Sequence, residues 1–134
     1  MDDEGLERLL DYDRRRFWLV NDWSVRFRIY RVSASAARPA GIKYSFTLHD
    51  DCGMRLLGFD NAHAIGGSVT FDHRHRFRKV RFVKSYEYRG ADTLLSDFFA
   101  EVERACEAEG IPFEFDDVDI VEESLAEDEK EDGT

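Results

Sequence analysis

The chain has 134 residues, of which 43% are hydrophobic and 13% aromatic, so it has the length and apolar content of one domain with a single core. No run of about 20 apolar residues could span a membrane, and residues 1–4 (MDDE) are acidic where a secretory signal is basic. We therefore expect a soluble, cytoplasmic protein with no membrane partner. Cys52 and Cys106 have neither metal-knuckle nor disulfide spacing, so we expect both to be reduced.

The net charge of −10 is distributed unevenly along the chain. Residues 1–11 carry a net charge of −4, residues 12–90 carry +9, and residues 91–134 carry −15. Thirteen of the sixteen cations in the middle segment are arginines, whose planar guanidinium suits bidentate contact with phosphate. A ligand responds to the face that it approaches, so we expect the middle segment to meet a polyanion. Alternatively, the arginines reflect genomic base composition and the acids only keep the protein soluble.

The apolar pattern of the first half predicts a short helix and three strands. Leucines recur at helical spacing in residues 5–12. Apolar and polar residues alternate in residues 23–32 and again in residues 43–49, which is typical of half-buried strands. The turn residues at 50–53 then predict that residues 54–59 return antiparallel to the strand before them.

The second half predicts one more strand and a long helix. The apolar residues of the strand over residues 71–88 change parity, which predicts a bulge or break near Arg78. The helix over residues 91–109 is expected to be capped by Asp92 or Thr93. Its stripe toward the core consists of Leu95, Phe98, Phe99, Val102 and Cys106.

Together these elements predict an α+β fold, namely a four-stranded antiparallel meander flanked by a short N-terminal helix and a longer C-terminal helix. We place this single domain in residues 1–112. Residues 113–134 are predicted to form an acidic, partly disordered tail, because a block of like charge repels itself. The tail from Glu114 onward is expected to be dispensable for folding and to compete with a polyanion for the basic part of the chain.

Three of the four histidines lie close together in the sequence, and they are the strongest candidates for chemistry. On a strand, His73 and His75 project from one face with Cα atoms about 6.6 Å apart, and we expect both to face solvent. Metal-free RNA cleavage needs a base for the 2′-OH proton, an acid for the leaving oxygen, and cations at the phosphorane. The candidate catalytic residues are His63, His73, His75 and Asp60.

The candidate substrate-binding residues lie in the same stretch of the sequence as these histidines. Asp60 or Asn61 could orient a histidine, while the neighbouring cations could hold phosphate. The predicted substrate-binding set is Asn61, Arg74, Arg76, Lys79 and Arg81. We expect no cofactor, since the sequence has no Walker loop, no GxSxG and no HExxH motif.

Two alternatives to this interpretation remain at the level of the sequence. A His-x-His pair in a charged strand is often only a solvated face. A zinc site made of three histidines and one carboxylate is also chemically reasonable, and it would use His63, His73, His75 and Asp60. We expect that no metal is bound.

Four segments, in this order and spacing, resemble the TumE family of toxin components in toxin–antitoxin pairs. They are residues 43–48 (KYSFTL), 56–63 (LLGFDNAH), 72–75 (DHRH) and 94–103 (LLSDFFAEVE). The resemblance spans roughly residues 23–105 and implies a bacterial or archaeal cytoplasmic toxin, by looser analogy similar to RelE-type ribosome-dependent endoribonucleases. It also implies a small helix-turn-helix antitoxin as partner. The chain departs from the family in its longer loop between His63 and His73 and in its acidic extension after Pro112.

The function predicted from these observations is a toxin that acts on RNA or ribosome-bound mRNA, as a metal-independent endoribonuclease with His73 and His75 as acid and base. The alternative is a non-catalytic module that binds nucleic acid or protein and in which the histidines are structural. The sequence leaves the oligomeric state, the cleavage specificity and the identity of the antitoxin open.

Overall fold

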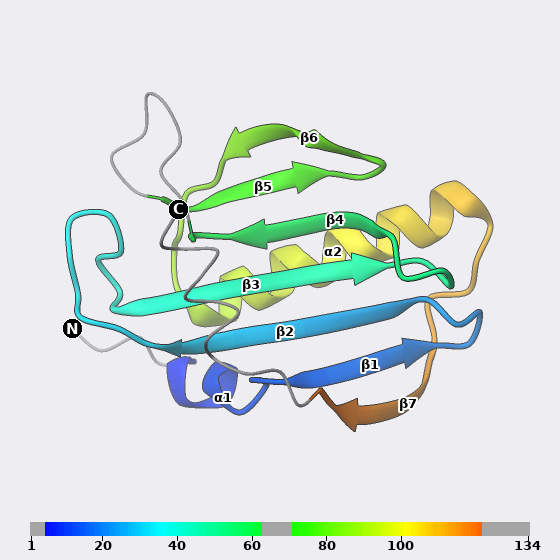
Figure 1. The fold of residues 1–134 in the computed structure, drawn as a ribbon, viewed down its shortest axis with the longest axis horizontal. Coiled ribbons are helices and arrows are strands. Elements are labelled where there is room, and N and C mark those ends of the chain that lie inside the picture. The colour runs from blue at the N-terminus through cyan, green and yellow to red at the C-terminus, as the bar shows by residue number, and fades with distance from the viewer. Residues whose placement is uncertain (1–4, 63–70, 122–134) are drawn as a thin grey trace.

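The structure is a computed structural model that describes residues 5–62 and 71–121, without the side chains of residues 80–82. It consists of two helices and the strands of one sheet (Figure 1). In chain order they are α1 (Leu6–Leu10), β1 (Arg15–Leu19), β2 (Ser24–Arg31), β3 (Ile42–His49), β4 (Arg55–Asp60), β5 (His73–Arg76), β6 (Lys79–Ser85), α2 (Ala91–Glu109) and β7 (Phe115–Ile120). None of the described helices is long and apolar enough to cross a membrane.

The strands form one antiparallel sheet in the order β6-β5-β4-β3-β2-β1-β7, and α2 packs behind its central strands (Figure 1). The α+β class, the antiparallel pairing and the two helices are confirmed. The predicted number of four strands is wrong, because the described residues form seven. The predicted strand over residues 71–88 is in fact the hairpin β5–β6, and β1 and β7 were not predicted.

The strands β1 and β7 escape a periodicity analysis because they are short and highly charged. Their charges are matched across the pair: Arg16 lies opposite Asp119 in the register, and its guanidinium donates two hydrogen bonds to that carboxylate, at 2.9 and 2.6 Å. Opposite charges on paired positions stabilise a sheet. The beginning of the acidic segment after residue 112 is thus the edge strand of the sheet, so the tail from Glu114 onward, which was expected to be dispensable for folding, includes β7.

The break predicted near Arg78 is confirmed. Arg78 has a φ of 57° and forms the turn between β5 and β6. Its backbone N–H donates to the carbonyl of Leu56 at 2.7 Å, which ties the hairpin turn to the start of β4. A non-glycine residue in the left-handed region needs such external support.

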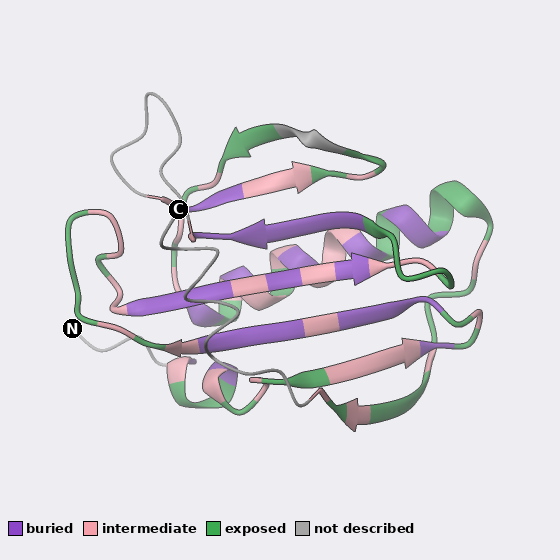
Figure 2. Cartoon of the chain, viewed as in Figure 1, coloured by how far each residue is buried: buried purple, intermediate pink, exposed green. Residues whose placement is uncertain are grey.

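The core lies between α2 and the inner face of β2, β3 and β4. Phe98 of α2 is fully buried, and its ring centroid lies 5.5 Å from Phe27, 5.6 Å from Phe46 and 5.8 Å from Phe59. These three phenylalanines occupy the alternating inward positions of β2, β3 and β4, as the period of two predicts. The central strands are accordingly the most buried part of the sheet (Figure 2).

The bounds of α2 match the prediction, but its start and its face differ in detail. The buried residues of α2 are Ala91, Leu94, Phe98, Val102, Ala105 and Cys106. Leu95 and Phe99 are only partly buried, so the inward stripe is turned slightly from the predicted one. Gly90 stands at the N-cap with no side-chain hydrogen bond. The predicted cap at Asp92 or Thr93 is therefore wrong, and Asp92 instead accepts hydrogen bonds from Arg8 of α1.

Candidate active site

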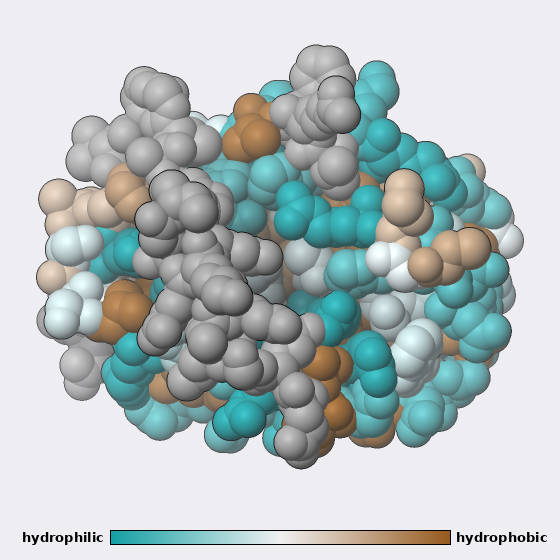
Figure 3. Space-filling view, in the orientation of Figure 1, coloured by the Kyte–Doolittle hydropathy of each residue, from teal (hydrophilic) through white to brown (hydrophobic). Residues whose placement is uncertain are grey.

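The register of the sheet brings a row of polar residues together on the face opposite α2. Arg28 of β2 pairs with Ser45 of β3, Ser45 pairs with Asp60 of β4, and Asp60 pairs with His73 of β5. His75 lies in the neighbouring row. Directly paired residues project from the same face, so these side chains share the open face of the sheet. Hydrophilic residues predominate among the described residues of this face (Figure 3).

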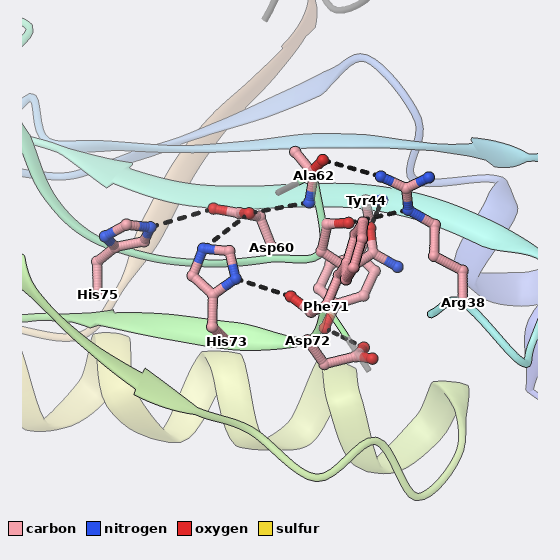
Figure 4. A network of polar contacts seen from close by, with 9 residues as sticks. Arg38, Tyr44, Asp60, Ala62, Phe71, Asp72, His73 and His75 are labelled. Carbon is pink, nitrogen blue, oxygen red and sulfur yellow. Dashed lines mark hydrogen bonds and ion pairs between the residues drawn. The ribbon is translucent and has the colours of Figure 1, made fainter. Parts of the chain in front are cut away.

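Asp60 is the centre of the site, because its carboxylate contacts both histidines (Figure 4). Oδ1 lies 3.0 Å from Nε2 of His73, and Oδ2 lies 3.2 Å from Nε2 of His75. The backbone N–H of Ala62 donates to Oδ1 at 3.1 Å and fixes the carboxylate from behind. The two imidazole rings stand 4.9 Å apart at an angle of 71°. The prediction that His73 and His75 share one face is confirmed.

Both ring nitrogens of His73 face oxygen acceptors. Nδ1 lies 2.8 Å from the carbonyl oxygen of Phe71, and Nε2 faces Asp60. Neither oxygen can donate a hydrogen bond when Asp60 is ionised, so the geometry suits an imidazolium that carries both protons. Burial lowers the pKa of His73, but the hydrogen bond and charge of Asp60 outweigh it and leave the pKa above the usual value.

The contacts with the two histidines shift the pKa of Asp60 in the opposite direction, namely downward. Burial would raise the pKa of the Asp60 carboxyl, but the hydrogen bonds from His73 and His75 hold it well below the usual range. The site therefore contains an ionised carboxylate between two imidazoles. Asp60, which the sequence analysis proposed as an orienting residue, contacts both histidines directly.

The charge state of this pair predicts a pH dependence of folding stability. The raised pKa of His73 contributes stability that is fully present below its unfolded pKa of about 6.5 and is lost as the pH rises through the folded value. The lowered pKa of Asp60 contributes stability that is present above about 3.9 and is lost as the pH falls. This pair should make the free energy of unfolding, measured with urea, larger at pH 5 than at pH 8, whereas His49, whose burial lowers its pKa, contributes in the opposite direction. In Asp60→Asn this difference should shrink; an unchanged difference would contradict the assignment.

The expectation that both histidines face solvent is wrong for His73. This residue is only 3% exposed, whereas His75 is half-buried. The ring of His73 contacts Asp60 and the carbonyl of Phe71 through its two nitrogens and lies against the ring of His75. His73 therefore has a structural contribution that a residue on a solvated face would lack.

A cavity of about 290 Å³ opens beside the histidines on the open face. Three cations line it, and none of them was predicted as a site residue: Arg28, Lys43 and Arg55. They come from β2, β3 and β4, and two of them occupy outward positions in the alternating pattern of their strands. Arg28 and Lys43 could have been proposed from the sequence, because they are cations at polar positions of two predicted strands. Their proximity to the histidines depended on the order of the strands.

Tyr44 and Asp72 form a second buried contact next to the site. The hydroxyl of Tyr44 donates to Oδ2 of Asp72 at 2.7 Å, and both residues are buried. Burial raises the pKa of Tyr44, and the neighbouring charge of Asp72 raises it further. The carbonyl of Asp72 also accepts the backbone N–H of Tyr86 at 3.0 Å. Because Asp72 precedes His73, these contacts fix the start of β5.

Arg38 holds together the two chain segments that lead to the site (Figure 4). Its guanidinium donates to the carbonyl of Asn61 at 2.9 Å and to that of Ala62 at 2.8 Å. It also lies over the ring of Phe71 at 5.1 Å. Through these contacts Arg38 connects the end of β4 to Phe71, and the carbonyl of Phe71 accepts the hydrogen bond of His73. The sequence offered no signal for this role.

The side chain of Asn61 is directed toward β3 rather than toward the histidines. Its Oδ1 accepts the backbone N–H of Tyr44 at 2.9 Å, and its Nδ2 donates to the carbonyl of Ile42 at 2.9 Å. With 2% exposure, Asn61 is enclosed in the protein. These contacts favour a structural role in joining the end of β4 to β3.

Arg74, Arg76 and Lys79, the predicted phosphate-binding cations whose side chains the structure describes, do not line the cavity. Arg74 and Arg76 border a separate hollow on the α2 side, and Arg74 lies 3.7 Å from Glu101 of α2. Lys79 is exposed at the turn end of the hairpin, opposite Arg76 in the register. Arg81 belongs to β6, but its side chain is outside the described part of the chain, as is the whole of His63.

Three of the four residues of the zinc alternative do come together. One ligand atom each from Asp60, His73 and His75 lies within 4.8 Å of the others. The Nδ1 contact of His73 with a carbonyl is also the kind of outer contact that orients a metal-bound imidazole. The fourth member, His63, is outside the described residues. The cluster could thus hold a cation as well as share protons, and metal content distinguishes the two.

A family model described as Toxin TumE matches residues 9–105. The chain belongs to the TumE toxin family. The match contains β1 to β6 and most of α2, and with them Asp60, His73 and His75. No curated protein and no solved structure matches the chain. Membership of the TumE family makes this protein a toxin of a toxin–antitoxin system and implies an antitoxin as its partner.

Proposed function

We propose that this TumE toxin acts on RNA as a metal-independent endoribonuclease in which His73 and His75 transfer the protons. The observation that carries the proposal is the contact of one carboxylate, Asp60, with both imidazoles beside a cavity lined by cations. General acid–base catalysis by imidazole operates near neutral pH without further groups.

The proposed reaction is an in-line attack within the RNA. His75, the more accessible of the two imidazoles, removes the proton from the 2′-OH, and the 2′ oxygen forms a bond to the adjacent phosphorus. The bond from phosphorus to the 5′ oxygen breaks, and the imidazolium of His73 donates a proton to that leaving oxygen. The products are a 2′,3′-cyclic phosphate and a 5′-hydroxyl, and the proton balance closes between the two histidines.

Asp60 supports both roles in this proposal. Its negative charge stabilises the imidazolium of His73, and its second oxygen orients His75. The phosphorane carries excess negative charge, which cations in the cavity would stabilise. Ribosome-bound mRNA as the substrate and a helix-turn-helix antitoxin as the partner remain proposals, supported by the resemblance described above.

The test is cleavage by the purified protein of RNA, alone and on ribosomes, in buffer with EDTA. We expect products that end in a 2′,3′-cyclic phosphate and a bell-shaped dependence of the rate on pH, as a base and an acid titrate. Cleavage that requires an added metal ion and is abolished by EDTA would favour the zinc alternative. A lack of cleavage under all of these conditions would contradict the proposed function.

A non-catalytic binding module is the second candidate, and the burial of His73 favours it. A histidine that is 3% exposed and paired with a carboxylate suits a purely structural role, in which it joins β4 to β5. Such a module would bind RNA with an affinity that falls with salt, because cations release counterions from the phosphates, and it would show no turnover. Turnover therefore separates the two candidates.

A further inference from the structure

We propose that Arg55, with Lys43 and Arg28, forms the binding site for the scissile phosphate of single-stranded RNA in the cavity beside the two histidines. The chemistry at that phosphate rests on the proposed function, whereas the binding of the anion does not. The cations predicted from the sequence, Arg74 and Arg76, border a different hollow.

The charge of the cavity is the first argument for an anion. Three permanent cations line it, namely Arg28, Lys43 and Arg55. Among the described residues of the lining, Asp60 is the one carboxylate, and it is already engaged by both histidines. Arg28 also pairs with Asp13 at 2.6 Å, which offsets part of its charge. Arg28 and Lys43 have further interactions as well, so Arg55 is the cation of the lining on which the proposal mainly depends.

The burial of Lys43 and Arg28 is the second argument. These side chains are only 6% and 7% exposed, and buried lysine and arginine are rare because the removal of a charge from water is costly. Whatever other contacts these two residues make, their positive charge adds to the attraction that Arg55 exerts on an anion in the cavity. Binding an anion recovers electrostatic energy that burial has made larger.

The side chain of Arg55 lies beside Gly58, which is the residue of β4 that pairs with His75. Gly58 lies directly between Thr47 and His75 in the register of the sheet. A Cβ atom at Gly58 would lie 3.9 Å from Nε of Arg55, so the guanidinium passes over the flat patch that the missing side chain leaves. Arg55 thus lies on the open face next to the row of His75.

The direction of the Arg74 side chain argues against this residue as the main phosphate contact. Arg74 neighbours His73 and His75 in the sequence, but it projects to the opposite side of β5, where Glu101 lies 3.7 Å away. His75 also lines the hollow that Arg74 borders, but His73 and Asp60 do not, so a phosphate held there would meet only one of the two imidazoles. Arg55 instead shares one cavity with both histidines.

The size of the cavity limits the form of the substrate. A volume of about 290 Å³ is at the lower end of small-molecule pockets, so it admits a phosphate with its ribose but not a base pair. Tyr30 lines the same cavity and offers an aromatic face near the phosphate site. RNA should therefore enter as a single strand.

The experiment measures binding without cleavage. A single-stranded oligoribonucleotide with 2′-O-methyl groups cannot undergo the attack, and its affinity can be measured by fluorescence anisotropy at several salt concentrations. We expect Arg55→Gln to weaken binding by about ten- to a hundredfold, as the loss of a charged hydrogen bond would. The slope of log affinity against log salt should fall by about one. Arg55→Lys, which keeps the charge but not the planar fork, should have an intermediate affinity.

The matched control is Arg8→Gln. Its side chain is 70% exposed in an ion pair on α1, away from the cavity, and its affinity should stay within about twofold of wild type, as for a distant surface charge. Wild-type affinity in Arg55→Gln, or an equal loss in Arg8→Gln, would overturn the proposal. Arg55-dependent binding by a protein that never cleaves RNA would support the phosphate site and contradict the proposed function.

Discussion

Replacing His75 with alanine should lower the rate of RNA cleavage by about a hundred- to ten-thousandfold, the usual contribution of a general acid or base. His75 is the better choice for this test because it is half-buried, whereas His73 is enclosed and joined to Asp60 and Phe71. The rate should be measured in single turnover with the RNA bound, so that a change in affinity does not mask a change in chemistry.

The control for this variant is His49→Ala. His49 lies at the end of β3, where its ring contacts Thr47 and the carbonyl of Gly53, and it is not among the residues that line the cavity. Its replacement should leave the cleavage rate within a few-fold of wild type. A His75→Ala variant that is as active as His49→Ala would show that the histidine pair does not perform the proton transfers.

The second histidine gives an internal check on the same assignment. Replacements of residues that act as one unit have non-additive effects on the rate. The variant that lacks both His73 and His75 should therefore cleave RNA at a rate within about tenfold of that of His75→Ala. His73→Ala should also lower the free energy of unfolding, because it leaves the buried Asp60 carboxylate with one imidazole partner fewer. Additive losses of rate would mean that the two rings do not serve one reaction.

The central strands and α2 could be predicted from the sequence because their periodicity reflects burial on one face. Phe27 and Phe46 belong to alternating apolar positions of two strands, and Phe98 belongs to an apolar stripe with helical spacing. All three are buried. The strand β7 could not be found in this way, since its acidic residues resemble a solvated tail. This strand is stabilised by its pairing with β1, where Asp119 accepts a hydrogen bond from Arg16.

The site was predictable to the extent that it is local in the sequence. A spacing of two residues is enough to place His73 and His75 on one face. The contact of Asp60 with both rings requires that β4 pair with β5, which no local pattern specifies. The cations show the same limit: Arg74 is adjacent to both histidines in the chain yet projects to the other face, whereas Arg55 reaches the cavity only through the fold.

Replacing Phe98 with alanine should lower the free energy of unfolding by about 3 to 5 kcal/mol, the range for a fully buried aromatic residue. Its ring has no exposed surface and touches the rings of Phe27, Phe46 and Phe59, one from each central strand. A small domain has a total stability of about 5 to 15 kcal/mol, so the variant should be close to unfolding at room temperature. Urea denaturation of wild type and variant measures the difference.

Phe99→Ala is the matched comparison, because it removes an aromatic ring of the same size from the next position of α2. Phe99 is only partly buried, although its ring lies 5.8 Å from Phe27 and 6.0 Å from Phe115 of β7. A partly exposed ring loses less transfer energy and leaves a cavity that water can fill, so its replacement should cost clearly less than that of Phe98. Equal losses in the two variants, or a loss below about 1 kcal/mol for Phe98→Ala, would contradict the packing of α2 on β2, β3 and β4.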